Sequence, residues 1–264
     1  MKRVLGPVAL VALGMWAWRG LDVDLSRIGR APAALADLVA SSFPPDLSQF
    51  DVIWAALIET FQIAILATIF GTLLALPLGV LAARNLFPPA LATSVRTVAN
   101  AVRVLPSILW ALVAVLVFGP GALAGVVAMT FYTIGYLAKL QSEAFEGLPR
   151  DALDAVRAMG LGRGTVAWHV AIPEAANALR SQVLFMLEYN VRNSSVVGLV
   201  GAGGMGILIS QAFQFFDYDR LAALLLVMFV AVVLLDGLSY LVRRRFVEME
   251  HAPRARWRDV ILPR

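Results

Sequence analysis

The segment VIWAALIETFQIAILATIFGTLLALPLGVLAA, residues 52–83, contains one charged residue, Glu59. An α-helix rises about 1.5 Å per residue, so about 20 apolar residues cross a hydrocarbon core roughly 30 Å thick. This segment exceeds that length, and it is longer than a core helix of a soluble protein needs. It therefore predicts a transmembrane helix.

Five further apolar segments occur along the chain, and most approach or exceed the length of a membrane span: residues 4–18, 104–118, 122–140, 183–209 and 221–242. Of the 264 residues, 60% are hydrophobic and 15% are charged, and the mean hydropathy is +0.78. A soluble domain of this composition has too little polar surface to cover itself. We predict an all-α, polytopic membrane protein with about six transmembrane helices.

The first apolar segment follows Lys2 and Arg3, as the apolar part of a secretory signal does. No small-x-small cleavage site follows it, so an uncleaved signal anchor is expected. Residues 1–52 are predicted to form this anchor and an external connector, residues 53–245 the transmembrane domain, and residues 246–264 a basic tail. The chain has no cysteine, which excludes disulfides, thiolate metal sites and cysteine nucleophiles.

Lysine and arginine residues gather on one side of the predicted spans, and such a bias marks the cytoplasmic side. Arg103, ahead of Pro106, belongs to this side and is interpreted as an anchor at the membrane margin. The other side receives only Arg19, Arg27, Arg30 and Arg220. The bias predicts that both termini are cytoplasmic. It also accounts for the net charge of +4 without a nucleic-acid partner.

The segment LVGAGGMGIL, residues 199–208, spells G-x-G-x-x-G, and Asp217 and Asp219 follow it. This spacing is typical of a dinucleotide site only where a strand precedes the glycines and a helix follows them within a parallel sheet. The surrounding segment is of membrane length, which argues against that site. Gly201, Gly203 and Gly204 instead indicate either close helix packing or a flexible segment near a permeation path.

The longest polar interruption, EAFEGLPRDALDAVRAMGLGRGTVAWHVAIPEA, covers residues 143–175. Pro149 favours a helix start, and Gly160, Gly162 and Gly164 favour its end. The helix between them has an apolar stripe of Ala152, Ala155, Val156 and Met159. A second short segment closes at Pro173. We predict a short amphipathic helix, a turn and a second segment on the cytoplasmic side.

The spacing within this loop is specific. Asp154-Ala155-Val156 is followed after three residues by Gly160, and after nine more by VAIP at residues 170–173. The pattern resembles the EAA loop of ABC-importer permeases, which reads E-A-A, three residues, G, nine residues, I-x-L-P. Asp154 replaces Glu, Val156 replaces Ala and Ile172 replaces Leu. These departures are mild, and the spacing is kept.

Two further stretches, RVLPSILWAL at residues 103–112 and EYNVRNSSVVGLVGAGGMG at residues 188–206, resemble the phosphonate-transporter branch of these permeases. The likeness extends over residues 103–245. It implies a fold like that of type I ABC importers and a place in the bacterial inner membrane. The implied partners are a second copy of the chain, two cytoplasmic ATPase subunits that hold ATP and Mg²⁺, and an extracytoplasmic phosphonate-type binding protein.

The chain itself has no G-x-x-x-x-G-K-[ST] phosphate loop, so it is not expected to be an ATPase or to bind a cofactor or metal. The resemblance makes the loop the site where the ATPase couples to transport. The residues assigned to coupling are Asp154, Ala155, Val156, Arg157, Gly160, Leu161, Gly162, Arg163 and Pro173.

The fifth apolar segment contains ionisable residues, which are costly within a membrane and normally face a cavity or a partner. Glu188 and Arg192 are spaced i, i+4, so an ion pair between them is one interpretation. The other is a route for a phosphonate-like anion, since guanidinium groups suit oxyanions. The candidate path residues are Glu188, Tyr189, Asn190, Arg192, Asn193, Ser194, Ser195, Gly201, Gly203 and Gly204.

Two other classes of protein remain as alternatives. A membrane enzyme would need a catalytic constellation, and His169 has no nucleophile paired with it in the sequence. A self-contained channel or secondary transporter for small anions would not need a loop that docks an ATPase. Phosphonate, phosphite and phosphate all remain candidate substrates, because the binding protein selects the substrate first.

Overall fold

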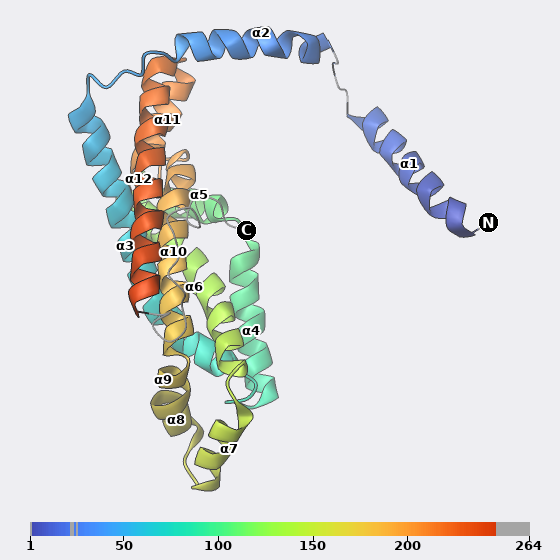
Figure 1. Cartoon of the computed structure of the whole chain (residues 1–264), viewed down its shortest axis with the longest axis vertical. Helices are drawn as coiled ribbons and strands as arrows, with labels where there is room; N and C mark the ends of the chain where they lie inside the picture. Colours follow the sequence, from blue (N-terminus) through green and yellow to red (C-terminus); the bar gives the residue numbers. More distant parts are fainter. Residues whose placement is uncertain (1, 22–23, 25, 247–264) are drawn as a thin grey trace. The chain divides into compact units, whose positions relative to one another are not determined.

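The structure is a computed structural model, and it describes residues 2–21, 24 and 26–246 (Figure 1). The chain divides into two compact units, which meet between Pro44 and Pro45. The first unit holds α1 (Lys2–Gly20) and α2 (Ser26–Ser41). α2 is amphipathic, and none of its residues is buried. The predicted basic tail lies outside the described residues, apart from Phe246 at its start.

The second unit is a helical bundle, and the described residues contain no strand. Its long helices and the short helices between them are α3 (Phe50–Ala82), α4 (Pro89–Val104), α5 (Ser107–Phe118), α6 (Ala122–Glu146), α7 (Arg150–Ala158), α8 (Arg163–Val166), the π-helix η1 (Ala167–Ala171), α9 (Ile172–Glu174), α10 (Ala176–Gly198), α11 (Met205–Gln214) and α12 (Tyr218–Phe246).

The α3 and α6 helices form the most extensive contact in the bundle. Small residues of α3 are fully buried there, among them Ala67 and Ala75, which cluster with residues of α6. Gly71 faces Thr133 so closely that a side chain at Gly71 would displace it. Small residues let helix backbones approach within a membrane, where packing rather than the hydrophobic effect drives association. The sequence of α3 therefore suits a central helix and not a purely lipid-facing one.

The α4 and α5 helices meet at a bend of 82°. Leu105 has an extended backbone, with φ −73° and ψ 124°, because the ring of Pro106 disfavours a helical conformation in the residue before it. The Trp110 indole donates a hydrogen bond to the Val102 carbonyl across the bend (3.1 Å). The prediction of one straight span at residues 104–118 is therefore wrong, since the 12 residues of α5 reach only about 18 Å.

The all-α polytopic fold is confirmed, whereas the division into six continuous helices is not. Among the described residues, α3, α6 and α12 are long and apolar enough to cross a membrane, and the bent pair α4 and α5 adds a fourth crossing if it counts as one span. The predicted span at residues 183–209 breaks after Gly198 into α10 and α11.

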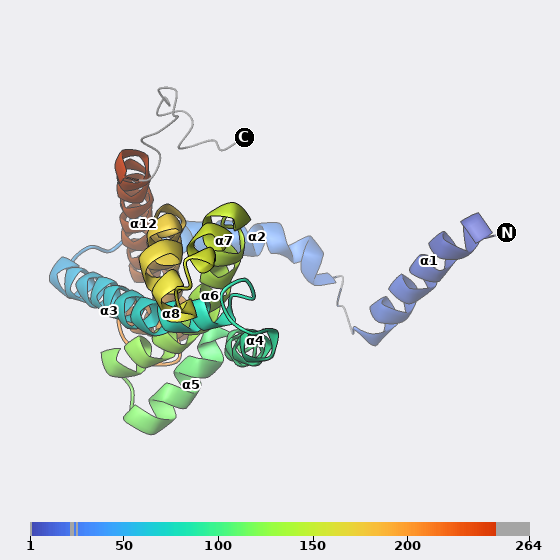
Figure 2. The same ribbon diagram turned by 90° about the horizontal axis from the view of Figure 1, so that it is seen from below.

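The residues between Glu143 and Ala175 lie at one end of the bundle, here called the loop end. Seen from that end, α7 and α8 lie across the ends of the long helices (Figure 2). Buried residues of the loop, Leu153, Val166 and Ala171, join Leu86 and Phe145 in one apolar cluster. The loop is therefore packed onto the bundle.

Candidate functional site

The loop forms the predicted short amphipathic helix. In α7, Leu153 is buried and Val156 packs against the cluster beneath it. Gly160 follows the helix with φ +76°, a conformation that favours glycine, so the predicted turn is confirmed. Gly162 lies just before α8 and has an extended backbone.

The predicted apolar stripe of α7 divides between two surfaces. Val156 faces the bundle, whereas Ala155 is exposed and Met159 is 69% exposed. Leu161 and Trp168 are also exposed, at 44% and 66%. The loop thus combines a packed side with an outward apolar side, which is the form expected of a docking element. The remaining predicted coupling residues lie within or next to it: Asp154 and Arg157 in α7, Arg163 in α8 and Pro173 in α9.

A π-helical turn, η1, precedes Pro173. Proline has no backbone N–H, so the carbonyl four residues earlier, that of His169, loses its usual donor. Pro173 lies inside the short helix α9, and α10 begins at Ala176. The second segment therefore ends, as predicted, near Pro173: the π-helical turn η1 precedes the proline, and a break separates α9 from α10.

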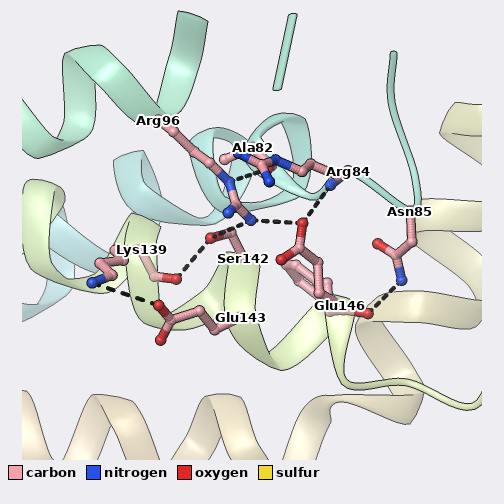
Figure 3. Close-up of polar contacts among 9 residues, drawn as sticks. Ala82, Arg84, Asn85, Arg96, Lys139, Ser142, Glu143 and Glu146 are labelled. Carbon is pink, nitrogen blue, oxygen red and sulfur yellow. Dashed lines mark hydrogen bonds and ion pairs between the residues drawn. The ribbon is translucent and has the colours of Figure 1, made fainter. Parts of the chain in front are cut away.

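A polar cluster at the base of the loop was not predicted (Figure 3). Glu146, the last residue of α6, forms an ion pair with Arg96 of α4 (2.7 Å). Its carboxylate also accepts a hydrogen bond from the backbone N–H of Arg84 (2.8 Å). Arg96 in turn donates through Nε to the Ala82 carbonyl at the end of α3 (2.8 Å) and through Nη2 to Ser142 (3.4 Å). The cluster ties α3, α4 and α6 together where the loop begins.

Two further contacts surround this cluster. The Asn85 side chain donates to the Phe145 carbonyl (2.7 Å). Lys139 and Glu143 form a pair one turn apart on α6 (3.6 Å), and both are substantially exposed. From the sequence alone, Arg84 and Arg96 are interpreted only as two of the basic residues on the predicted cytoplasmic side of the membrane. Glu146, the partner of both, lies 62 residues from Arg84 and 50 from Arg96 in the chain, so no local spacing reveals the pairs.

The predicted path residues of α10 point in different directions. Asn190 is fully buried and donates to Thr68 of α3 (2.9 Å) and Thr133 of α6 (3.0 Å). Asn193 donates to Ser107 at the start of α5 (2.7 Å). Interhelical bonds of this kind hold membrane helices together. Both amides therefore join helices of the bundle.

The neighbouring candidates bond within their own helix or stack on other rings. The buried Ser194 and the half-buried Ser195 donate to the carbonyls of Val191 and Arg192. Tyr189 stacks on Tyr132, with ring centroids 5.3 Å apart. These residues do not converge on one cavity.

The predicted ion pair between Glu188 and Arg192 is wrong. Glu188 pairs with Arg243 of α12, and Arg192 pairs with Asp236 of the same helix (3.7 Å). α12 runs antiparallel to α10 and presents opposite charges two turns apart, so each α10 residue meets a partner across the interface. The two ion pairs join α10 to α12.

The glycine segment forms the break between α10 and α11. Gly203 and Gly204 have φ of +91° and +65°. A Cβ atom on Gly203 would lie 2.9 Å from Ile63 Cδ1, and one on Gly204 would lie 2.5 Å from Thr60 Oγ1. Gly201 accepts a hydrogen bond from the Gly121 N–H (2.8 Å). The close packing predicted for these glycines is confirmed.

The dinucleotide interpretation fails because the described residues contain no sheet to carry it. Asp217 and Asp219 also interact with each other at the start of α12, where a hydrogen bond with Asp219 raises the pKa of the Asp217 carboxyl. Neither acid is presented as a ribose ligand beside the glycines.

Arg103 lies beside the middle of α6 and not at the loop end. A Cβ atom on Gly135 of α6 would lie 3.0 Å from the Arg103 backbone nitrogen, so the two backbones are in contact there. Gly135 lies near the middle of α6, about 16 Å along the helix from Glu146. The predicted anchor role is therefore wrong, because α4 climbs beside α6 from the loop end toward the middle of the bundle.

The fold matches that of a solved structure. The chain superposes on a chain of the inward-facing MetNI methionine ABC transporter with a TM-score of 0.68 at 24% identity, covering 76% of this chain and 98% of that one. The bundle therefore shares the fold of that transporter chain.

A family model described as the binding-protein-dependent transport system inner membrane component matches residues 75–248. The chain belongs to this family, and it is a multi-pass, non-catalytic transport subunit of the inner membrane. It is 34% identical to the putative phosphite transport system permease protein HtxC of Stutzerimonas stutzeri, over 88% of this chain and 83% of that protein. It is 32% identical to the phosphite transport system permease protein PtxC of the same organism, over 92% and 90%.

Proposed function

We propose that the chain is the membrane-spanning subunit of an ATP-driven importer for a phosphorus oxyanion, namely phosphonate, phosphite or phosphate. The relatives named for phosphite transport support the substrate class. One structural observation carries the rest: the loop packs onto the bundle through Leu153 of the short helix α7, and it exposes Met159 just after α7 and Trp168 in η1. Such a helix suits a cleft in a soluble partner.

The assembly that we propose contains two copies of this chain, two cytoplasmic ATPase subunits and an extracytoplasmic binding protein. Two copies are expected because a translocation path between two subunits is lined by residues of both. Closed twofold symmetry is also the commonest form of homo-oligomer. In this assembly the loop end and both chain termini face the cytoplasm. The excess of Lys and Arg toward that side supports the orientation.

Movement of the loop is transmitted to the membrane part through the polar cluster at its base. Glu146 ends α6 immediately before the loop and binds Arg96 of α4. A partner that shifts α7 therefore pulls on α6 and α4 together. The glycines after Gly198 add a second tightly packed element next to the path, where Gly203 and Gly204 lie against α3.

A self-contained channel or secondary transporter is the alternative function. It is less favoured because it gives no role to the exposed apolar residues of the loop.

The test is uptake by the complete complex. The chain is co-expressed with its ATPase and binding protein, and uptake of labelled phosphite, phosphate and methylphosphonate is measured with and without ATP. We expect ATP-dependent uptake of at least one of them. Uptake that needs neither ATP nor the binding protein would favour the channel or secondary transporter.

The loop is tested by Ala155→Asp and Gly160→Trp, which place charge or bulk on its docking side. Both variants should abolish the stimulation of ATP hydrolysis by loaded binding protein while the chain stays in the membrane. Ala33→Asp, which adds the same carboxylate to the exposed helix α2, is the matched control and should leave coupling intact. Normal coupling in both loop variants would contradict the assignment.

A further inference from the structure

The α4 helix carries two arginines on one side, and they differ in their partners. Arg96 is held by Glu146 and by the Ala82 carbonyl. Arg103, two turns further along, is half-buried, and no hydrogen bond or ion pair joins its side chain to any residue that the structure describes. Its backbone lies against Gly135 in the middle of α6.

The acids nearest to this depth are already engaged. Glu188 is paired with Arg243, and Asp236 is paired with Arg192. The charge of Arg103 is therefore not neutralised within the described part of the chain. An ionisable residue at membrane depth normally faces a water-filled cavity or a partner. The structure therefore points to a polar environment outside this single chain.

The exposed surface of α4 has two different sides. One is apolar, with Leu91 and Val98 42% and 64% exposed. The other is polar and carries Thr93, Thr97 and Asn100, all exposed. The Thr97 hydroxyl is satisfied by the Thr93 carbonyl (2.9 Å), but the exposed Asn100 amide has no hydrogen-bond partner among the described residues. Lipid therefore suits the first side better than the second, because an amide group needs hydrogen-bond partners. The polar side is the one on which Arg103 lies, one turn beyond Asn100.

Polar side chains continue from Arg103 toward the loop end. A small pocket of about 40 Å³ between α4 and α6 is lined by alanines and by four polar side chains, those of Arg96, Asn100, Lys139 and Ser142. Asn100 thus lies between the unpaired arginine and this pocket. Polar side chains therefore follow α4 from Arg103 to the loop end. Arg96 and Lys139 are paired with Glu146 and Glu143, whereas Arg103 has no counter-ion among the described residues.

We infer that Arg103, with Asn100, contacts the transported oxyanion at mid-membrane. The inference rests on the proposed function and names the residues that the cargo meets. A guanidinium presents a planar fork of donors that matches two oxygens of a tetrahedral oxyanion, and the Asn100 amide adds a neutral donor one turn away. Arg192, the residue chosen from the sequence, is less suited because Asp236 shares its charge.

The test uses the complete complex and labelled inorganic phosphate and phosphite. Arg103→Gln should lower the maximal uptake about tenfold or more, since it removes a charge-assisted contact. Arg103→Lys should recover part of it. Asn100→Asp should lower uptake more than Asn100→Ala does, because a carboxylate repels the anion. In each variant the loaded binding protein should still stimulate ATP hydrolysis, so ATP is consumed without transport.

Arg220→Gln is the matched control, because it removes the same charge at the start of α12 and should keep wild-type uptake. If Arg103→Gln transports as well as Arg220→Gln, the inference is overturned while the importer remains. If uptake and ATP hydrolysis fall together in Arg103→Gln, Asn100→Asp decides the inference, because it leaves the arginine in place. Wild-type uptake by Asn100→Asp would then overturn it. A different outcome is a wild-type complex that transports neither phosphate nor phosphite while Arg103→Gln keeps the normal stimulation of ATP hydrolysis. That outcome would count against the proposed substrate class and not against the role of Arg103.

Discussion

At the scale of single residues, backbone conformation and space restrict Gly203 and Gly204 most strongly. Both have positive φ, and both have neighbours from α3 within the reach of a Cβ atom. A side chain there meets two costs at once, strain in the backbone and displacement of Ile63 or Thr60. Thr60 cannot withdraw easily, because its hydroxyl accepts a hydrogen bond from the Met205 N–H (2.8 Å).

We predict that Gly203→Leu and Gly204→Leu abolish uptake while the ATPase subunits remain bound. Gly237→Leu is the control, since no atom lies within 4 Å of a Cβ at that position of α12. Uptake and co-purification of the ATPase are the measurements. Normal uptake in both variants would mean that the break tolerates bulk. Saturable NAD binding by the purified wild-type chain would revive the dinucleotide interpretation.

At the scale of secondary-structure elements, charged pairs decide how neighbouring helices are joined. α10 is joined to α12 by Glu188 with Arg243 and by Arg192 with Asp236. α4 is joined to α6 by Arg96 with Glu146. The second connection lies directly beneath the loop, so it is the better placed of the two to carry movement into the membrane part.

We predict that Glu146→Gln lowers substrate-coupled uptake severalfold with the complex still assembled, because Arg96 loses its counter-ion and the loop its link to α4. Side-chain exposures of 22% for Arg96 and 28% for Glu146 place the pair between surface and buried pairs, so the variant should cost roughly 1–2 kcal/mol of stability. Thermal unfolding of the detergent-solubilised complex measures this.

The matched control is Glu143→Gln, one turn away from Glu146 on the same helix. Its carboxylate is 53% exposed and pairs only one turn along α6 with Lys139, and such surface pairs contribute about 0.5 kcal/mol or less. It should leave uptake unchanged. If Glu143→Gln and Glu146→Gln lowered uptake equally, the Arg96 and Glu146 pair would have no particular role in coupling.

At the scale of the whole molecule, the orientation in the membrane follows from the loop. We predict that reporters fused after Arg245 and inserted at Phe87, in the connector between α3 and α4, register as cytoplasmic. A reporter inserted at Gln49, before α3 at the opposite end of the bundle, should register as external. An external signal from the fusion after Arg245 would show that the number of crossings differs by one.

The sequence by itself determined the membrane class and the short amphipathic helix of the loop, and it gave close packing as one of two interpretations of the glycine segment. These features depend on local patterns: long apolar runs, helical periodicity with glycine and proline at its ends, and glycines spaced within one segment. Gly160 ends α7 as its place in the sequence predicts, because the positive φ there is a local requirement. The EAA-like spacing likewise lies within one continuous loop.

Only the tertiary structure decided which charges meet and how deep they lie. The spacing of Glu188 and Arg192 favoured a pair within α10, but α12 offered each of them a partner across the interface. The sequence places Arg103 among the basic residues at the edge of a predicted span. The bend at Pro106 and the contact with Gly135 place it near the middle of the bundle. Helical periodicity gives the faces of one helix but carries no information on which helix lies opposite, and that neighbour fixes both the partner and the depth of a charge.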